Sequence, residues 1–430
     1  MDRHLNRATA MRATPPASNA PAVARSSEGE NGGKDMEVMS ADSVNAAKLI
    51  GAAEDLLPIV RKYAQESNAI RRQPDAVIDA FRNAGFFDAM RPADVGGSAI
   101  DLRTFVEITK IISRGDASAG WVASFLMSHQ LILSRLNAEA QAEIFGSGPG
   151  LAAAAAAPPG RVEPVAGGYR VTGRWRFAST ILHCNWAVVS AGGPDTGPLV
   201  IVARIDEGKI HDTWHVPGMR GTGSNDFELC DAFIPAHRVD NFIHYSSRTN
   251  DGAALYPSYE LLQYPMYRIL SIIHGAVAVG TAEAAFELYP SIVANRVRPA
   301  SGQPFSQEPG AHSTYGEAAQ QLQVAQLLLT DAVDRTERLY RRGTSDPSLE
   351  ERARLSLAVT GSGVEALRAV DTIVQNAGAS IHRDGHPLDL ICRDTQVMRN
   401  HAVLDWRHAQ MMAGRILLGQ GLGDHPDAMY

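Results

Sequence analysis

The sequence predicts an α+β protein with an N-terminal α-helical domain (42–149), a middle antiparallel β domain (150–255) and a C-terminal four-helix bundle (256–430). Three observations predict this order. Apolar residues recur every three or four positions up to about residue 145, which is the spacing of one helix face. Short alternating runs bounded by Gly, Asp and Pro then follow, as in antiparallel strands. Four long helical patterns with short links end the chain.

Residues 1–41 are rich in Ala, Pro, Ser, Gly and Asn and have no helical or strand period. Such a segment cannot bury enough apolar surface to offset its ordering entropy, so we expect a disordered tail. It carries several Arg residues but no apolar run, which excludes a secretory signal. A transit peptide and a start codon placed too early are the alternatives.

The helical domain has two clear signals. In "DLRTFVEITKIISRGDAS" the residues Leu102, Phe105, Val106 and Ile112 share one helix face. The next segment, "SAGWVASFLMSHQLILSRL", is nearly all apolar, so we expect a helix that is buried or lines a pocket.

Strands are expected in "GGYRVTGRWRF", "NWAVVSAGG", "PLVIVARID" and "NDFELCDAFIP". The four bundle helices are expected near 257–298, 313–343, 347–377 and 388–420. The third contains the small residues of "TGSGVEALRAV", which permit close approach of a neighbouring helix.

Composition argues against several classes of function. The 430 residues carry a net charge of −7, whereas nucleic-acid-binding domains are usually basic. Three isolated cysteines give no disulfide framework and no CxxC metal pair, which favours a reducing cytoplasm. The apolar run Ile269–Ala282 is too short to span a bilayer, so no membrane partner is expected. The sequence also lacks a Rossmann fingerprint, a P-loop, HExxH and GxSxG.

Three segments indicate a family. They are "GGYRVTGRWRFAST", "GMRGTGSNDFELCDAFIP" and "PLDLICRDTQVMRNH". Together with the α–β–α order they resemble the acyl-CoA dehydrogenase fold over about residues 45–420. The resemblance implies that the middle domain is an antiparallel β-barrel and that the first two segments meet a flavin.

The dehydrogenases of this fold use a Glu to remove the α-proton of an acyl thioester. At the two places where such enzymes carry it, this sequence has His401-Ala402 after the Arg-Asp pair, and Tyr267 before Arg268. Acyl-CoA oxidation therefore lacks its base. A flavin dehydrogenase or oxidase with an unusual base stays an alternative.

The "FAST" turn, "RGTGSND" and a His after the Arg-Asp pair resemble the two-component flavin-dependent monooxygenases of this fold. The resemblance implies an enzyme that takes reduced FMN or FAD from a separate NAD(P)H:flavin reductase and uses O2 as co-substrate. In such enzymes a flavin C4a-hydroperoxide transfers one oxygen atom to a small organic substrate, which is aromatic in the phenol hydroxylases. Oxygenation at carbon, sulfur or nitrogen stays open, as does a non-catalytic helical scaffold of the same fold.

The resemblance assigns three catalytic candidates. Ser179 would accept from the flavin N5–H, His401 would lie near C4a, and His129 would meet the substrate oxygen. Each has a structural alternative: a strand-end Ser, a helix-surface His paired with Asp405, and a core His bonded to backbone. The segment "LAAAAAAPPG" lacks the Ser that meets the phenol in those hydroxylases, which favours a more apolar or differently bound substrate.

The remaining candidates surround flavin and substrate. With His129, Trp121 and Met127 are expected to form the substrate pocket. The cofactor-binding set is Phe177, Ala178, Ser179, Thr180, Trp214, Arg220, Thr222, Ser224, Arg296 and Arg298, in which Arg side chains would meet the flavin phosphate. No metal is expected, because the fold implies a flavin. The resemblance also implies a homotetramer, in which a neighbouring subunit completes the flavin site.

Overall fold

The computed structural model describes residues 41–146, 148–297 and 302–424. Its helices and seven-stranded sheet confirm the expected α+β class. The expected disordered tail falls outside the described residues except for Ala41, where the first helix begins. Arg298 also lies outside the described residues.

The N-terminal helices are α1 (Ala41–Ile70), α2 (Asp75–Asn83), α3 (Leu102–Gly115), α4 (Ala117–Leu133) and α5 (Ala138–Phe145). Helix α4 begins where the Asp116 carboxylate accepts the Ala119 N–H, which is an N-cap. All α4 side chains except Phe125 are buried, as the apolar run predicted. The reason is that α4 packs against α3 and, much later in the chain, α8 (Met266–Ala294).

The strands are β1 (Ala152–Val165), β2 (Gly168–Ala178), β3 (Trp186–Gly193), β4 (Gly197–Arg204), β5 (Lys209–His211), β6 (Asn225–Pro235) and β7 (Val239–Asn241). They form one sheet in the order β5-β6-β2-β1-β3-β4-β7. Its pairs are antiparallel as expected, with the exception of β1 and β3. These two run parallel because β2 returns along β1, and the chain then crosses to the other edge of β1 before β3 begins beside Ala152.

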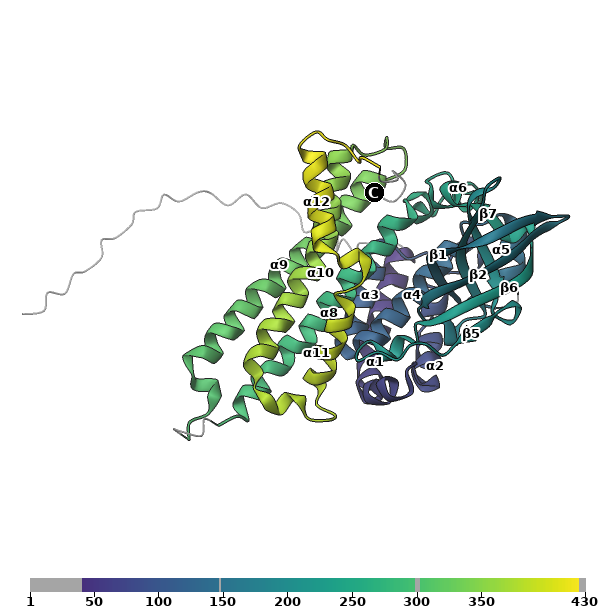
Figure 1. The fold of residues 1–430 in the computed structure, drawn as a ribbon. Helices are drawn as coiled ribbons and strands as arrows, with labels where there is room; N and C mark the ends of the chain where they lie inside the picture. The colour runs from purple at the N-terminus through teal and green to yellow at the C-terminus, as the bar shows by residue number, and fades with distance from the viewer. Residues whose placement is uncertain (1–40, 147, 298–301, 425–430) are drawn as a thin grey trace, which may run out of the picture. The chain divides into compact units, whose positions relative to one another are not determined.

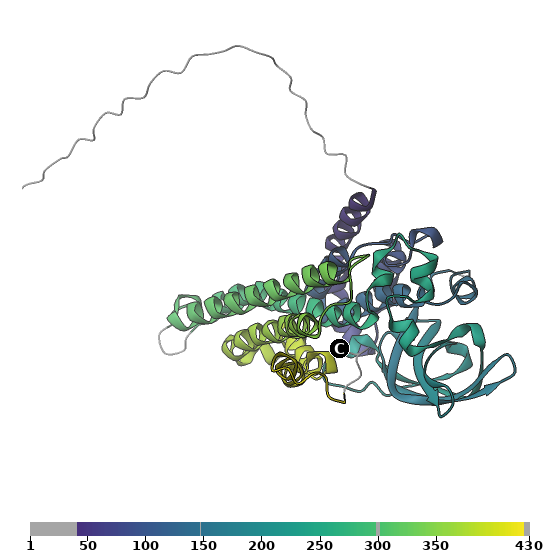
Figure 2. The same ribbon diagram turned by 90° about the horizontal axis from the view of Figure 1, so that it is seen from above.

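The bundle contains α8, α9 (Pro309–Tyr340), α10 (Leu349–Ala377), α11 (Pro387–Met398) and α12 (Trp406–Leu417), and the short helices α6 (Phe242–Ser246) and α7 (Asp251–Leu255) precede it. Helices α8, α9 and α10 lie side by side (Figures 1 and 2). Gly275 permits the close approach of α8 to α10, since a Cβ there would lie 2.4 Å from the Ser362 Oγ.

The helix expected at 388–420 is interrupted, which corrects the prediction of one continuous final helix. Between α11 and α12, the His401 Nδ1 accepts the Val403 N–H across 3.3 Å. The Asp405 carboxylate then accepts the His408 N–H across 3.0 Å. Each side chain caps a new turn, so the chain bends here. His401 therefore lies in a bend, and Asp405 serves the backbone of α12.

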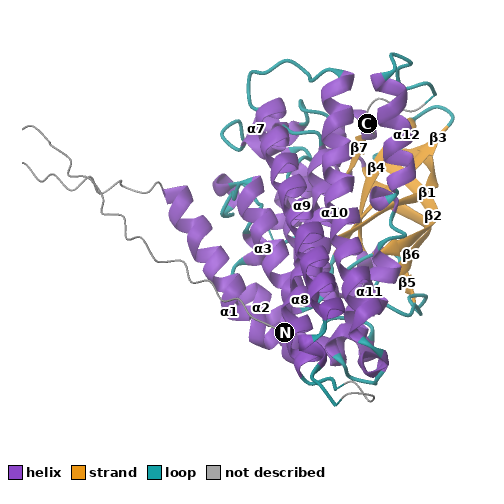
Figure 3. Cartoon of the chain, turned by 90° about the vertical axis from the view of Figure 1, so that its left-hand side faces the viewer, coloured by secondary structure: helices purple, strands orange, loops and turns teal. Residues whose placement is uncertain are grey.

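In Figure 1, helices α3 and α4 lie between the sheet and the bundle, since α4 contacts β1 and both helices contact α8. Figure 3 shows the sheet at one side of the helices. Within the described part of the chain, only α8 is long and apolar enough to cross a bilayer, but 78% of its most apolar window is buried inside the protein. Such burial is typical of the core helix of a soluble protein.

Candidate active site

Strand β2 ends in a tight turn that presents an aromatic ring. Phe177 and Thr180 adopt positive φ angles of 60° and 69°, a conformation that is uncommon for residues other than Gly. The Thr180 N–H donates to the Thr222 carbonyl across 2.9 Å, which holds the turn against the loop before β6. Ala178 is buried, whereas Phe177 is 64% exposed and lies edge-on to Trp214, with ring centroids 6.1 Å apart.

Beside this turn, four side chains form a hydrogen-bond chain whose direction its two ends determine. The Trp121 indole N–H, which can only donate, donates to the Ser179 Oγ across 3.2 Å. At the other end, the Thr222 hydroxyl donates to the Met219 carbonyl across 2.8 Å. Thr222 has then used its only proton, so Ser224 donates to Thr222 across 2.7 Å. Ser179 in turn donates to Ser224 across 2.8 Å. The remaining lone pair of Ser179 can only accept.

Backbone carbonyls hold the loop before β6. The Trp214 indole N–H donates to the Met219 carbonyl across 2.9 Å. The Arg220 guanidinium donates to the carbonyls of Asn68 and Val216, at 2.7 and 3.0 Å. Arg220 thus ties the loop to the end of α1, which is a structural role. Its expected contact with a flavin phosphate stays a prediction.

The Arg-Asp pair of α11 joins this loop to the bundle. The Asp394 carboxylate accepts the Met219 N–H across 2.5 Å, and Arg393 donates to the Pro217 carbonyl across 3.0 Å. Burial, reinforced by the carboxyl group of Asp116, raises the pKa of Asp394 well above its usual range. The two residues are not paired with each other in any described contact; both hold the loop.

An apolar cavity of about 200 Å³ lies between α4, α8 and the sheet. We call it the inner cavity. Its lining residues are Phe125, His129, Ile132, Ala154, Ala155, Ala156, Val188, Val189, Ser190, Val200, Phe242, Tyr245, Met266, Tyr267, Leu270, Ser271, His274, His401 and Val403. Its polar side chains are those of three histidines, two serines and two tyrosines, and no carboxylate is among these described lining residues. A base of the acyl-CoA dehydrogenase kind is therefore missing from this wall.

The backbone partners of two histidines define their tautomers. His129 Nδ1 lies 2.5 Å from the Ala152 carbonyl, which can only accept, so Nδ1 carries the proton and Nε2 is an acceptor. His401 Nδ1 accepts the Val403 N–H, so in the neutral ring Nε2 carries the proton and donates. Burial lowers the pKa of both His129 and His401 to about 4. Near neutral pH these two rings therefore give the cavity one imidazole acceptor, on His129, and one imidazole donor, on His401.

Trp121 joins the hydroxyl chain to the cavity rings. Its ring stacks on Phe125 with centroids 5.2 Å apart, and it meets His401 and His274 edge-on at 5.4 and 4.9 Å. Trp121 itself is buried behind the cavity wall. Met127, expected beside the substrate, is fully buried and does not line the inner cavity.

Arg296 lies away from these residues within one chain. It follows α8, 22 positions after His274, and a helix rises 1.5 Å per residue, which places it roughly 33 Å further along the axis. Its guanidinium donates to the Asn376 carbonyl across 3.2 Å and covers the Phe305 ring at 4.1 Å. Within one chain Arg296 thus lies far from His274, and its expected contact with a flavin phosphate stays a prediction.

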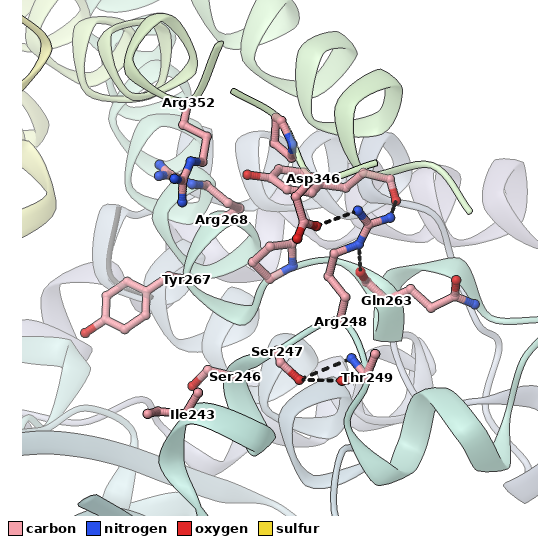
Figure 4. A pocket seen from close by; sticks show the side chains of 13 residues that line it. Ile243, Ser246, Ser247, Arg248, Thr249, Gln263, Tyr267, Arg268, Asp346 and Arg352 are labelled. Atoms are coloured by element: carbon pink, nitrogen blue, oxygen red, sulfur yellow. Dashed lines mark hydrogen bonds and ion pairs between the residues drawn. The ribbon is translucent and has the colours of Figure 1, made fainter. Parts of the chain in front are cut away.

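A second, larger cavity of about 580 Å³ (Figure 4), which we call the outer cavity, shares one lining residue with the inner cavity. Its lining residues are Ile243, Ser246, Ser247, Arg248, Thr249, Gln263, Pro265, Tyr267, Arg268, Tyr340, Asp346, Pro347 and Arg352. Arg248 donates to Asp346 across 3.0 Å and to the Gln263 carbonyl across 3.3 Å. Tyr267 borders both cavities, so its side chain forms part of the wall between them.

The turn after β2 fits a flavin. An exposed Phe177 ring offers a face against which a flat ring can pack. Ser179 offers a single acceptor, which suits a ring N–H. Trp214, on the neighbouring loop, lies edge-on to Phe177. Trp121 links this turn to the inner cavity, because it donates to Ser179 and stacks on Phe125, which lines the cavity.

Comparison with known proteins agrees with this geometry. Residues 272–406 match the family model "Acyl-CoA dehydrogenase, C-terminal domain". The chain is 32% identical over 373 residues to the flavin-dependent monooxygenase oxygenase subunit HsaA of Rhodococcus jostii, covering 84% of this chain and 95% of that protein. It is 28% identical over 385 residues to the FADH(2)-dependent resorcinol hydroxylase oxygenase component of a Rhizobium species, covering 86% and 94%.

Solved structures extend the likeness to the whole described fold. The HsaA monooxygenase of M. tuberculosis superposes with a TM-score of 0.82 at 28% identity, covering 90% of this chain and 100% of that one. XiaF from a Streptomyces species, solved with FADH2 and glycerol, gives 0.83 at 25% identity, covering 90% and 98%.

Fold and site together define a flavoenzyme of the acyl-CoA dehydrogenase fold that lacks the dehydrogenase base. The chain belongs to the flavin-dependent monooxygenases that act as oxygenase components of two-component systems. It uses reduced flavin and O2, and it depends on a separate reductase to oxygenate a small molecule.

His274 is not among the site residues predicted from the sequence. It follows "SII" in an apolar helix, the same signal that indicated His129 on α4.

Proposed function

We propose that the protein hydroxylates a small phenol-type aromatic ring. The observation that supports this most is the inner cavity, whose apolar wall contains imidazoles but no carboxylate and adjoins Trp121 and Ser179. Apolar walls suit an aromatic ring, and a neutral imidazole suits an aryl hydroxyl. The expectation that a missing hydroxyl on β1 disfavours phenols is thereby set aside, since histidines supply the polar contacts.

His129 and His401 have complementary roles in this proposal. The His129 Nε2 lone pair accepts the hydrogen bond of the phenol, which raises electron density on the ring. The His401 Nε2–H donates to the oxygen that is transferred. Neither ring carries a charge near neutral pH, so the site stays dry and apolar.

Ser179 is the proposed partner of the flavin ring. Its hydroxyl proton is committed to Ser224, so it presents an acceptor and matches a flavin N5–H. Reduced FMN or FAD, when bound, supplies the two electrons that reduce dioxygen. One oxygen atom enters the aromatic C–H bond to give C–OH, the other leaves as water, and the flavin is oxidised.

Arg296 supports the proposal of a homotetramer. Arg296 lies roughly 33 Å along the helix axis from His274, so in this proposal it meets the flavin of a neighbouring copy. Arg296→Ala should weaken flavin binding without changing the solution mass. We also propose a cytoplasmic location, in line with the isolated cysteines.

The test supplies reduced FMN or FAD from an unrelated flavin reductase and offers a panel of simple phenols under ¹⁸O2. A hydroxylated product with one ¹⁸O atom is expected. An oxidised product without label, or oxidation of an acyl-CoA without O2, would contradict oxygenation and indicate a dehydrogenase. The reductase without the protein is the control.

A further inference from the structure

We infer that His274 is a second substrate-binding acceptor in the inner cavity, and that the substrate is therefore an aromatic molecule with two hydrogen-bond donors. This inference rests on the proposed function and adds the substrate class. The donors are ring hydroxyls or N–H groups.

His274 occupies a defined place in the cavity wall. It lies on α8, is 3% exposed, and lines the inner cavity together with His129 and His401. Its ring stacks on His401 with centroids 4.0 Å apart and planes at 27°. The Trp121 ring also lies nearly perpendicular to it, with centroids 4.9 Å apart, so two rings restrict the rotation of the imidazole.

The nitrogen atoms of His274 differ in their contacts. Nδ1 lies 3.4 Å from the Ser271 carbonyl, one turn earlier on α8, so it carries the proton. Nε2 is thus an acceptor, and it has no hydrogen-bond partner among the described residues. A buried polar atom without a partner is costly, and native proteins usually satisfy it. A donor on the substrate would satisfy this one.

The charge state of the ring agrees with an acceptor. Burial first, and then the neighbouring His401, hold the pKa of His274 well below its ordinary value. The ring therefore stays neutral at neutral pH and keeps its lone pair.

Packing fixes the backbone that carries His274. The next residue, Gly275, sits against α10, where a Cβ would meet the Ser362 Oγ at 2.4 Å. Helix α8 therefore lies close against α10 at this point, and α4 packs on α8 as well. The imidazole is thus held by two neighbouring helices, as a recognition group must be.

The first acceptor comes from a different helix. His129 stands on α4, and both His129 and His274 meet the Phe125 ring edge-on, with centroids 5.1 and 6.3 Å away. A substrate ring in the cavity would have one acceptor from α4 and one from α8. A molecule with a single hydroxyl satisfies only one of them, which is the basis for discrimination.

The test measures equilibrium binding of two probes of similar shape to the full chain with reduced FMN, without oxygen. Resorcinol has two hydroxyl donors, and 3-methoxyphenol has one. The wild type should bind resorcinol roughly 10-fold or more tightly than 3-methoxyphenol, the size of one buried hydrogen bond. His274→Phe keeps the stacked ring but removes the acceptor, so this preference should fall to within about 3-fold. His274→Gln retains a carbonyl acceptor and should recover part of it.

Controls separate recognition from folding and from turnover. His312→Phe, on the exposed surface of α9, should keep the wild-type preference, and thermal melting verifies that each variant is folded. A wild type that binds both probes equally, or neither, overturns the inference, as does an unchanged preference in His274→Phe. If the preference behaves as expected but ¹⁸O enters neither probe, the two-donor inference stands and aromatic hydroxylation fails. If ¹⁸O enters a probe but the binding preference is the same in His274→Phe as in the wild type, only the two-donor inference fails.

Discussion

The Trp121 indole N–H donates to the Ser179 hydroxyl across 3.2 Å, which links the helix behind the substrate cavity to the turn that fits the flavin. The bond also starts a chain of defined direction that ends at the Met219 carbonyl. The helix that carries Trp121 and the turn that carries Ser179 are thus joined by one set of hydrogen bonds of fixed direction. Several expectations follow from this chain and its neighbours.

Ser224→Ala removes the group that accepts the Ser179 proton. Ser179 can then turn its proton toward the flavin, so it no longer presents only an acceptor. More of the reduced flavin should be lost as hydrogen peroxide, with a peroxide-to-product ratio raised roughly 5- to 10-fold for about 1 kcal/mol. Ser179→Ala should have a larger effect in the same direction. The control is Ser134→Ala, because the Ser134 hydroxyl donates to the Gln130 carbonyl and is not part of this hydrogen-bond chain. Equal peroxide-to-product ratios in the wild type and the three variants would contradict the role of Ser179 as an acceptor.

His401→Ala removes the Nε2–H donor from the inner cavity. We expect product formation to fall roughly 10²- to 10⁴-fold, the usual contribution of a positioned proton-transfer group. The affinity for reduced flavin should stay close to that of the wild type, because no described contact joins His401 to the loop before β6. His401→Gln should recover part of the rate through its amide N–H. Single-turnover product yield is the measurement, and a wild-type yield in the Ala variant would exclude the role.

Asp394→Ala breaks the bond to the Met219 N–H and releases the loop that carries Thr222 and Ser224. Losing one bond to a buried group should weaken reduced-flavin binding roughly 10-fold in an anaerobic titration. Asp394→Asn keeps a carbonyl oxygen for Met219. Because burial raises the pKa of Asp394 and so disfavours its charged form, a neutral amide costs little here, and the Asn variant should bind flavin almost normally. Equal affinity of the Ala and wild-type proteins would be inconsistent with this loop contact.

His129 should make stability depend on pH. Burial lowers its pKa from 6.5 to about 4, so between these values the unfolded chain binds a proton that the native ring does not. The free energy of unfolding therefore falls as pH drops from 6.5 to 4, by up to about 3 kcal/mol. Asp116 acts in the opposite direction, because burial raises its pKa to about 6 and the native state then binds the extra proton.

The contribution of His129 is therefore measured as a difference. The unfolding free energy of wild type minus that of His129→Phe should shrink by about 3 kcal/mol between pH 7 and pH 4. Since Asp116 is present in both proteins, its effect cancels. A difference that is constant with pH would mean that native His129 titrates like an unfolded one.

Much of the fold was predictable because local patterns carry it. The helical spacing around Phe105, the apolar run of α4 and the alternating strands around Trp175 each determine an element through their own neighbours. Residues 388–420 show where this fails. Their helical period is continuous, but side chains at 401 and 405 cap new turns, and the helix breaks.

The sequence by itself determined the element types, the three-part order, the missing carboxylate base and the motif that places Ser179. Tertiary structure decided which side chains share a cavity. His129 and His274 are far apart in the chain and meet the same Phe125 ring only because α4 packs on α8. It also decided the direction of the hydroxyl chain and the tautomers, because a donor or acceptor role follows from the partner that the fold supplies. A sequence lists the polar groups, whereas only packing determines which of them keep an unused lone pair.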